Sequence, residues 1–141
     1  MALKVFVDSD VVISSLISTT GAAFLILNQT DDLELFISNI SNLELEKVTE
    51  RLGLDTDRLK ALIKERFTVI HLEEAIEKIK TNFAEYTFDI DDTHIVAGAK
   101  VAGIQFLISY NTKHFKADKL KEDFNIILTT PSNLLQYLRS I

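Results

Sequence analysis

Four oxygen-bearing side chains lie near the ends of predicted strands, far apart in the sequence. Asp8 directly follows the apolar run Leu3–Val7, and Glu44 lies in the first turn of the helix predicted after the second strand. Asp92 precedes the fourth predicted strand, and Asn111 follows it. Because the chain has no cysteine and no paired histidines, a cluster of these oxygens suits Mg²⁺ or Mn²⁺ rather than zinc.

Strands that alternate with helices must bring these side chains together. Apolar runs of strand length recur along the sequence, separated by segments with helical periodicity or helix-capping residues. The predicted strands cover 3–7, 33–39, 67–72, 104–109 and 124–130, and the predicted helices cover 9–17, 22–27, 41–52, 55–66, 73–83, 92–103 and 131–138. This alternation indicates an α/β fold with one parallel sheet covered on both faces. Ligands of such sheets bind at the carboxyl ends of the strands, near a switch in strand order.

Length and composition narrow the class of protein. The chain has 141 residues, of which 47% are hydrophobic and 26% charged, so we expect one globular domain spanning 1–141. The absence of cysteine excludes disulfides and cysteine nucleophiles, and is compatible with a reducing cytosol. No apolar run approaches the roughly 18 residues of a membrane span, and Met1 to Lys4 lead straight into a strand pattern. We expect a soluble, cytoplasmic protein with no membrane partner.

The charge balance constrains a nucleic-acid partner. Fifteen Lys and Arg against 21 Asp and Glu give a formal charge of −6, which repels a polyanion unless the charge is offset locally or by metal ions. The best local basic stretch runs from Lys113 to Lys121 and also contains Asp118. It has two interpretations, a solvated helix face or a nucleic-acid contact, and the nearby acids favour the first.

Each of the acids also has a purely structural interpretation. Asp8 or Asp10 could cap the helix that follows the first strand, because Asp is a favoured N-cap residue. Glu44 could complete a capping box with Ser41, and Asp92 could cap the helix rich in small residues that follows it. Capping explains acids before helices, but it does not explain why the chain has no other cluster capable of chemistry. The joint pattern therefore favours a site.

The histidines and serines are weaker candidates for catalytic residues than the acids. His71, His94 and His114 are each more typical of a structural or solvent-facing histidine than of a catalytic one, and His114 is the nearest to the proposed site. The sequence has no glycine-rich phosphate loop and no G-x-S-x-G elbow, and its serines lack a triad-like histidine base. Serine hydrolase chemistry is therefore disfavoured.

With these residues assembled, the chain resembles the PIN-domain nuclease family, which includes the VapC-like toxins of toxin–antitoxin systems. The resemblance covers essentially the whole length and rests on three segments in order, which are VFVDSDVVISSLIS, ISNISNLELEKV and DDTHIVAGAKVAGIQFLISYNTKHF. They place the acids of the family on Asp8, Glu44 and Asp92. The ending LTTPSNLLQYL also fits the closing strand and helix of the family's fold.

The resemblance implies a three-layer α/β/α fold and roles for individual residues. Asp8, Glu44 and Asp92 would be catalytic and would hold Mg²⁺ or Mn²⁺. Many members have an aspartate where this chain has Asn111, whose carbonyl oxygen can still coordinate one ion, whereas the loss of this carboxylate disfavours a second ion. Residues that would bind or orient the substrate are Ser9, Thr112, Lys113 and His114.

The function implied by the resemblance is that of a metal-dependent ribonuclease, a hydrolase that cleaves RNA phosphodiester bonds and leaves a 5′-phosphate. The chain would then be the toxin of a toxin–antitoxin pair, with RNA as substrate, an antitoxin protein as partner and a homodimer as its assembly. Single-stranded or looped RNA is the expected target.

Two other interpretations stay open. Because Asn111 replaces a carboxylate, the chain could be a PIN-like module that binds RNA or protein without turnover. The opening Asp8-Ser9-Asp10-Val11 also matches the Asp-x-Asp of haloacid-dehalogenase-type phosphatases. Against the phosphatase, the usual glycine after the second acid is absent, and the chain is short for that fold.

Overall fold

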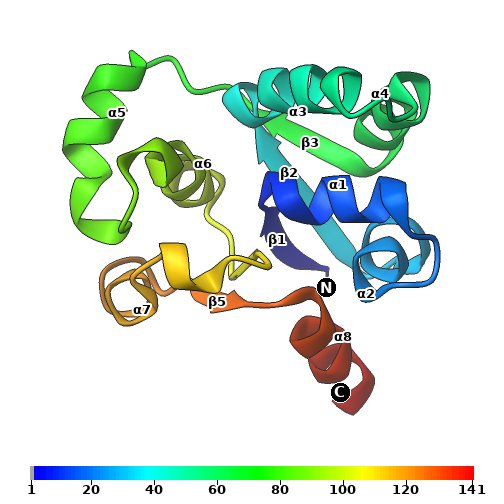
Figure 1. Ribbon diagram of the computed structural model, residues 1–141. Helices are drawn as coiled ribbons and strands as arrows, with labels where there is room; N and C mark the ends of the chain where they lie inside the picture. The colour runs from blue at the N-terminus through cyan, green and yellow to red at the C-terminus, as the bar shows by residue number, and fades with distance from the viewer. Residues whose placement is uncertain (1) are drawn as a thin grey trace.

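Five short parallel strands form one sheet at the centre of the molecule (Figure 1). The computed structural model describes residues 2–141, so Met1 of the predicted domain lies outside the described residues. The strands are β1 (Leu3–Val7), β2 (Leu33–Ser38), β3 (Phe67–Ile70), β4 (Phe106–Ile108) and β5 (Ile127–Thr129), in the order β3-β2-β1-β4-β5. Because β2 and β4 both pair with β1, the strand order reverses between β1 and β4. The switch point of the sheet therefore lies at the carboxyl ends of these two strands.

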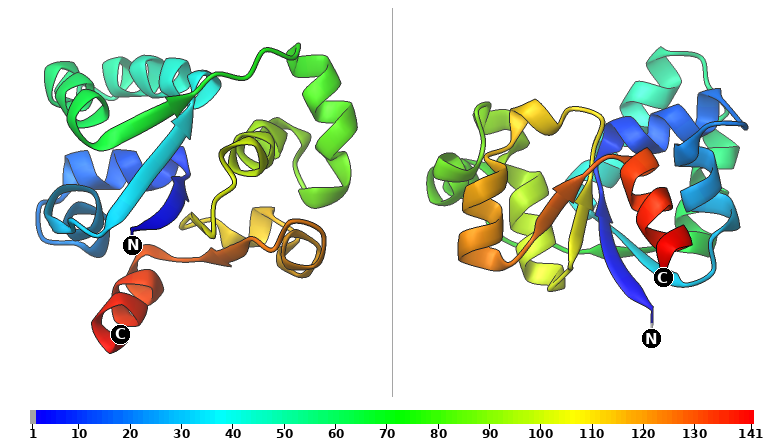
Figure 2. Two further views of the ribbon diagram at one scale, coloured as in Figure 1. Left: turned by 180° about the vertical axis from the view of Figure 1, so that it is seen from behind. Right: turned by 90° about the horizontal axis from the view of Figure 1, so that it is seen from below.

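Helices cover both faces of the sheet, which confirms the predicted three-layer α/β/α fold (Figure 2). One face packs against α1 (Ser9–Ile17), α2 (Ala22–Phe24), the π-helix η1 (Leu25–Gln29), α3 (Asn39–Arg51), α4 (Thr56–Arg66) and α8 (Pro131–Ser140). The other packs against α5 (Ile76–Phe83), the short 3₁₀ helix η2 (Ala84–Tyr86), α6 (Thr93–Ala102) and α7 (Ala117–Phe124). Two further 3₁₀ turns, η3 (Ile90–Asp92) and η4 (Thr112–His114), lie in the loops before α6 and after β4.

The strands supply apolar side chains to both faces in alternation. In β1, Val5 and Val7 pack in one hydrophobic core, and Phe6 between them packs in the other. The central residues of β2 and β4 follow the same pattern, with Leu35, Ile37, Phe106 and Ile108 on one side and Phe36 and Leu107 on the other. A strand that is buried on both faces reads as a continuous apolar run, which is how these strands appear in the sequence.

Helix starts agree with the prediction in two places and differ in one that matters for the site. Asp55 caps α4 and Thr130 caps α8, as predicted. The predicted capping box of Ser41 and Glu44 is wrong, because α3 begins at Asn39 and its N-cap is Ser38. Ser38 ends β2 in an extended conformation, and its Oγ accepts a hydrogen bond from the Ser41 amide at 3.1 Å. Glu44 is therefore free of a capping role.

The last two strands are shorter than predicted. The observed β4 covers three residues of the predicted 104–109, and β5 covers three of 124–130. The segment before β5 is taken by α7, which ends at Phe124 because Asn125 adopts a left-handed conformation with φ of 57°. The basic stretch that begins at Lys113 thus lies partly on a helix, in agreement with one of its two interpretations.

No single helix within residues 2–141 is long and apolar enough to cross a membrane. A pair of helices, Ser9–Ile17 with Ala22–Gln29, passes such a test by length and composition only, and it is bent by 105° at its break. Several apolar side chains of this pair, including Val11, Ile26 and Leu27, are buried in the core of the domain.

The helix α6 lies very close to the sheet at Gly98. A Cβ atom added to Gly98 would lie 2.6 Å from Cζ of Phe6 and 2.8 Å from its Cε2. Phe6 is fully buried between the sheet and α6, so its ring has little room to move. The missing side chain at Gly98 thus sets the distance between α6 and β1.

We predict that Gly98→Ala lowers the free energy of unfolding by about 1–3 kcal/mol, because overpacking outweighs the gain in helix propensity. Urea unfolding followed by circular dichroism measures the change. As a control, Phe6→Leu shortens the clashing side chain, so the double variant should be more stable than the sum of the two single effects. Strict additivity would show that the clash with Phe6 is not the cause.

Candidate functional site

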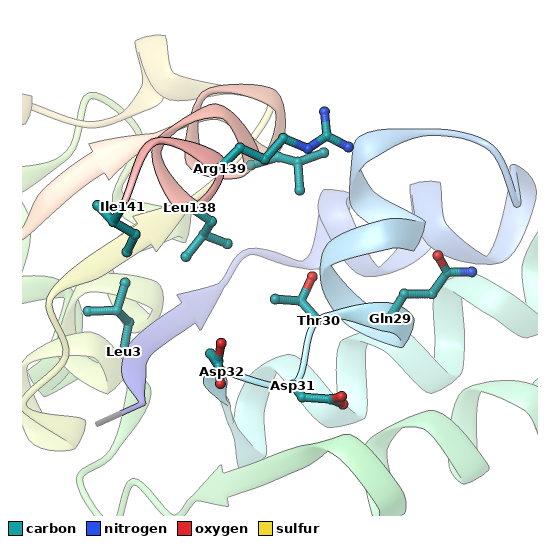
Figure 3. A pocket seen from close by; sticks show the side chains of 9 residues that line it. Leu3, Gln29, Thr30, Asp31, Asp32, Leu138, Arg139 and Ile141 are labelled. Carbon is teal, nitrogen blue, oxygen red and sulfur yellow. The ribbon is translucent and has the colours of Figure 1, made fainter.

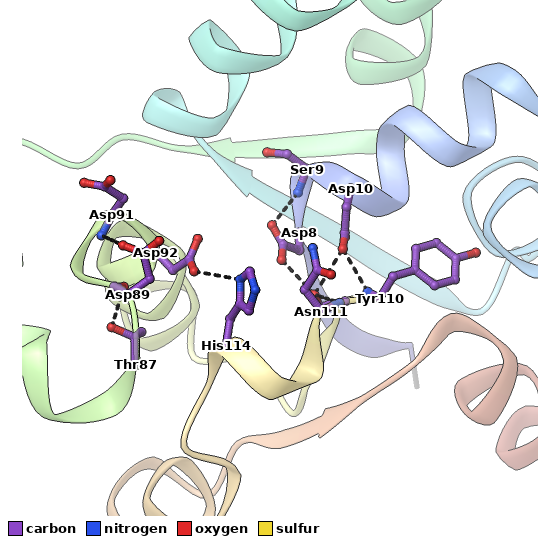
Figure 4. Close-up of polar contacts among 11 residues, drawn as sticks. Asp8, Ser9, Asp10, Thr87, Asp89, Asp91, Asp92, Tyr110, Asn111 and His114 are labelled. Carbon is purple, nitrogen blue, oxygen red and sulfur yellow. Dashed lines mark hydrogen bonds and ion pairs between the residues drawn. The ribbon is translucent and has the colours of Figure 1, made fainter.

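Asp8 lies at the end of β1 and opens α1, so it combines a structural and a potential chemical role (Figure 4). It is the N-cap of α1, and its Oδ1 accepts a hydrogen bond from the Ser9 amide at 2.7 Å. Its Oδ2 accepts a second bond from Oγ of Ser109 at 2.8 Å, and Ser109 directly follows β4. Of the two acids that could cap this helix, Asp8 is the cap, and its carboxylate also joins the end of β1 to the residue after β4.

Asp10 lies in the first turn of α1 and does not cap it. Its Oδ2 accepts a hydrogen bond from the Tyr110 amide at 3.0 Å and lies 3.4 Å from Oγ of Ser109. Its Oδ1 is buried and has no hydrogen-bond partner, and the same holds for Oγ of Ser9. Asp10 thus joins α1 to the loop after β4 and leaves one carboxylate oxygen without a partner.

Ser109 is the residue of this site that the sequence reasoning missed. Its fully buried Oγ donates to Asp8 and accepts a hydrogen bond from the Asn111 amide at 2.9 Å. A signal was available, because Ser109 is the first polar residue after the apolar run of β4 and so falls at the carboxyl edge of the sheet. Its hydroxyl fixes Asp8 relative to the loop after β4.

Asp92 and His114 form a second polar group opposite Asp8, as Figure 4 shows. Asp92 stands at the N-cap position of α6 but makes no capping hydrogen bond with its side chain. Instead, its Oδ2 lies 3.2 Å from Nδ1 of His114 on η4. Capping therefore does not account for Asp92, and the pair connects the loop before α6 to the loop after β4.

Glu44 points from α3 toward α6, where it contacts His94. The distance from Glu44 Oε1 to His94 Nε2 is 3.4 Å, and the glutamate side chain is about half exposed at 52%. His94 is buried, and burial lowers its pKa to about 4, so its ring is neutral at neutral pH. The interpretation of His94 as a structural histidine agrees with this position, because its ring supports a carboxylate without adding charge.

The acids of the site affect one another electrostatically. Burial is the main cause that raises the pKa of Asp8, and the Asp92 carboxylate raises it further, against hydrogen bonds from Ser109 and Ser9 that lower it. Burial and then the Asp92 carboxylate also raise the pKa of Glu44. Burial and the nearby Asp8 raise the pKa of Asp10 to about 6.

Asp92 shows the same pattern. Burial raises its pKa, as does the Asp89 carboxylate, while His114 lowers it. Carboxylates from β1, α3 and the loop before α6 are thus near enough to disfavour one another's charge. A cation among them would relieve this repulsion.

The donor set fits a cation that keeps much of its water. Among residues 2–141, no three His, Cys, Asp or Glu side chains are arranged to ligate one ion directly. Mg²⁺ usually retains several waters and meets only one or two carboxylates, so a looser arrangement of oxygens is compatible with it. Oγ of Ser9 and Oδ1 of Asp10 are also buried at this edge without a hydrogen-bond partner, so each has hydrogen-bonding capacity that none of residues 2–141 uses.

The other predicted site residues lie on the loop after β4. Asn111 is exposed, and its backbone contacts the site: its amide donates a hydrogen bond to Oγ of Ser109, and its carbonyl oxygen accepts one from the His114 amide at 3.0 Å. Thr112, Lys113 and His114 form η4, and both Lys113 and His114 are exposed. Within residues 2–141, Lys113 makes no ion pair, so its charge is available at the rim of the site.

A cavity of about 600 Å³ lies elsewhere, at the amino end of β1 (Figure 3). Its lining includes Leu3, Asp31, Asp32, Leu138 and Arg139. Because Leu3 begins β1 and Asp8 follows its end, the cavity and the carboxylates lie at opposite edges of the sheet. The candidate site is therefore the acidic edge at the carboxyl ends of the strands and not this cavity.

Known structures share this fold. A toxin–antitoxin complex from Klebsiella pneumoniae contains a chain with 21% sequence identity and a TM-score of 0.65, covering 90% of this chain and 97% of that one. VapC20 of Mycobacterium tuberculosis, described as a toxin that cleaves the sarcin–ricin loop, has 18% identity and a TM-score of 0.54, covering 85% and 95%. VapBC2 from Rickettsia felis, bound to a DNA fragment from its promoter, has 13% identity and a TM-score of 0.61, covering 91% and 98%.

At these identities the structures establish similarity of fold alone. No curated protein matches the chain in sequence. The sequence does match the PIN domain family over residues 4–113, a segment that contains β1 from Lys4 on, all of β2 to β4, and the acids Asp8, Asp10, Glu44 and Asp92. The chain therefore belongs to the PIN domain family.

Proposed function

We propose that this protein is a divalent-metal-dependent endoribonuclease that hydrolyses RNA phosphodiester bonds. One observation carries the proposal: Asp8, Glu44 and Asp92 come from three separate elements, and the Asp92 carboxylate raises the pKa of both of the others. A fold does not collect mutually repelling carboxylates at a sheet edge for stability, so a ligand that compensates them is expected. Membership of the PIN domain family and the fold shared with toxins support a nuclease.

In this proposal Asp8, Glu44 and Asp92 hold Mg²⁺ or Mn²⁺, directly or through water, with the carbonyl oxygen of Asn111 as a further available ligand. A bound divalent ion supplies a water of lowered pKa and offsets the charge of the phosphodiester. Ser109 keeps the Asp8 carboxylate in place, and His114 does the same for Asp92. The hydrogen bonds of Asp8 thus leave its orientation fixed before any ligand arrives.

Substrate contacts in this proposal come from the rim of the site. Lys113 is exposed and free of ion pairs within residues 2–141, so it can bind a backbone phosphate. His114 uses Nδ1 toward Asp92, which leaves Nε2 for a second polar partner. Ser9 and Thr112 would orient water or phosphate near the acids.

The biological role that we propose rests on the resemblance of this chain to toxins of toxin–antitoxin systems. We propose that the chain acts in the cytoplasm as the toxin of a toxin–antitoxin pair, forms a homodimer, and is held inactive by an antitoxin protein. The solved structures that share its fold include toxin–antitoxin complexes, which supports this part of the proposal.

A non-catalytic PIN module is the second candidate, and one observation favours it. Asn111 is exposed, and its side chain makes no hydrogen bond to any of residues 2–141. Because its amide is neutral, it adds no negative charge to the group of acids. A haloacid-dehalogenase-type phosphatase loses support, since the chain belongs to the PIN domain family. RNA cleavage separates the nuclease from the binding module.

We predict that the protein cleaves a mixed pool of single-stranded RNA in the presence of Mg²⁺ or Mn²⁺. Asp8→Asn and Asp92→Asn should each lower the rate by roughly 100-fold or more, because each removes a negatively charged group that holds the ion, and the ion offsets the charge of the phosphodiester. Denaturing gels of end-labelled RNA measure the rate. Asp32→Asn is the matched control, because this exposed aspartate lies at the opposite edge of the sheet. Equal cleavage by all four proteins would point to a contaminating nuclease.

We predict that Mn²⁺ raises the melting temperature of the wild-type protein. An ion at 100 times its dissociation constant adds about 2.7 kcal/mol to stability when it binds the folded state alone. Asp8→Asn should abolish most of this rise, whereas Asp32→Asn should retain it. A wild-type melting temperature that does not respond to Mn²⁺ or Mg²⁺ would contradict the metal site.

We predict a pH dependence of stability that Asp10 causes in the metal-free protein. The pKa of Asp10 is raised from 3.8 to about 6 by folding, so the folded state binds this proton more tightly. The resulting stability is present at pH values below 3.8 and is lost as the pH rises through about 6. Asp10→Asn should therefore gain stability relative to wild type across that window, as measured by urea unfolding in chelator. A difference that is constant with pH would show that Asp10 titrates normally.

A further inference from the structure

Phe88 is an exposed aromatic side chain beside the candidate site. The chain has nine phenylalanines, and within residues 2–141 Phe88 is the one whose side chain faces solvent, with 72% of its surface exposed. It directly precedes Asp89, at the start of the loop that carries Asp92. Phe88 belongs to neither of the two hydrophobic cores.

The backbone holds Phe88 firmly against the loop after β4. The Phe88 amide donates a hydrogen bond to the carbonyl oxygen of His114 at 2.9 Å, and the Lys116 amide donates to the carbonyl oxygen of Tyr86 at 2.9 Å. Thr87 and Phe115 between them form an antiparallel bridge. Phe88 is thus fixed next to His114, whose ring contacts Asp92.

A lysine without a carboxylate partner lies against this ring. The Nζ atom of Lys116 lies 5.2 Å from the centre of the Phe88 ring, a cation–π arrangement. Within residues 2–141 neither Lys113 nor Lys116 has a carboxylate partner, whereas Lys119 pairs with Glu85 at 3.6 Å and Asp123 at 3.7 Å. One lysine without a carboxylate partner, Lys116, therefore lies against the exposed ring, and a second, Lys113, directly precedes His114, whose backbone pairs with Phe88. Both are basic groups in a chain whose net charge is −6.

A hollow of about 350 Å³ adjoins the ring. Its lining consists of Phe88, Phe115, Lys116, Ala117, Asp118 and Lys119. The hollow is therefore bounded by aromatic surface and by lysine side chains, with one acid, Asp118, at its rim.

We infer that Phe88 is a stacking platform for a base of the RNA strand next to the cleaved bond, with Lys113 and Lys116 binding the neighbouring phosphates. The inference rests on the proposed ribonuclease function and adds a substrate-binding residue to it. Single-stranded nucleic acid offers both parts that this surface matches, a base for the ring and phosphates for the free lysines. An apolar protein segment would use the ring but would leave the two lysines without partners.

Because the chain contains no tryptophan, Phe88→Trp places a single fluorescent reporter on the platform. In chelator, so that no cleavage occurs, a short single-stranded oligoribonucleotide should quench this fluorescence through base stacking. An abasic strand of the same length should bind through its phosphates without quenching. Ile17→Trp is the matched control, because Ile17 is similarly exposed at 64% and lies at the far end of α1. Its fluorescence should not respond to either strand.

Affinity measured by fluorescence anisotropy of labelled RNA separates stacking from charge. Phe88→Ala should weaken binding by roughly 5- to 100-fold and leave the dependence on salt unchanged, because a stacked base contributes no counterion release. Lys116→Ala should reduce the slope of log affinity against log salt by about 0.7, the value for one phosphate contact on a single strand.

Equal quenching of Phe88→Trp by the RNA and by the abasic strand would contradict the proposal that Phe88 stacks on a base. An RNA affinity of Phe88→Ala equal to that of the wild-type protein would also contradict it. If wild-type protein cleaves RNA while Phe88→Ala binds and cleaves normally, the platform is wrong and the nuclease proposal stands. If RNA quenches Phe88→Trp but wild-type protein cleaves no RNA with either metal, the platform is supported and the nuclease proposal is wrong.

Discussion

Repulsion among carboxylates at the carboxyl edge of the sheet is the constraint on which the rest of this structure depends. Asp8 is held at the end of β1 by hydrogen bonds from Ser9 and Ser109, and Asp92 faces it from the loop before α6. Burial and neighbouring charges raise the pKa of each acid, so the folded chain keeps them together at a cost in stability. Packing in the rest of the fold must therefore supply enough stability to offset the cost of keeping these carboxylates together.

The parallel sheet provides that packing and also sets the geometry of the site. Alternating side chains of β1, β2 and β4 fill two hydrophobic cores, and α6 approaches β1 closely at Gly98. The reversal of strand order between β1 and β4 places Asp8 and Ser109 side by side. The same loop after β4 pairs with Thr87 and Phe88, so backbone contacts link the loop that carries His114 and the free lysines to the segment that carries the exposed ring.

Much of this arrangement was predictable from the sequence, for definite physical reasons. Continuous apolar runs such as Leu3–Val7 are typical of strands that are buried on both faces, and Asp55 and Thr130 are strong capping residues. The position of Asp8 at the carboxyl end of β1 followed from the apolar run that ends at Val7.

Contacts between distant segments were harder to predict. Ser38 and Ser41 are equally good caps by type, and only the end of β2 determines that Ser38 is used. The bridging role of Ser109 depends on the pairing of β1 with β4, and local sequence contains no information on that pairing. The exposure of Phe88 likewise results from a backbone pairing with the His114 loop, about 25 residues along the chain.

The central claim is that a divalent cation compensates the carboxylates at this edge of the sheet. The most direct measurement is an anomalous difference map from crystals of the wild-type protein grown or soaked in Mn²⁺. The account predicts a Mn²⁺ peak among Asp8, Glu44 and Asp92, with oxygen ligands at about 2.2 Å, and no such peak in Asp8→Asn. A map with Mn²⁺ bound only elsewhere, or an equally strong peak at this edge in Asp8→Asn, would contradict it.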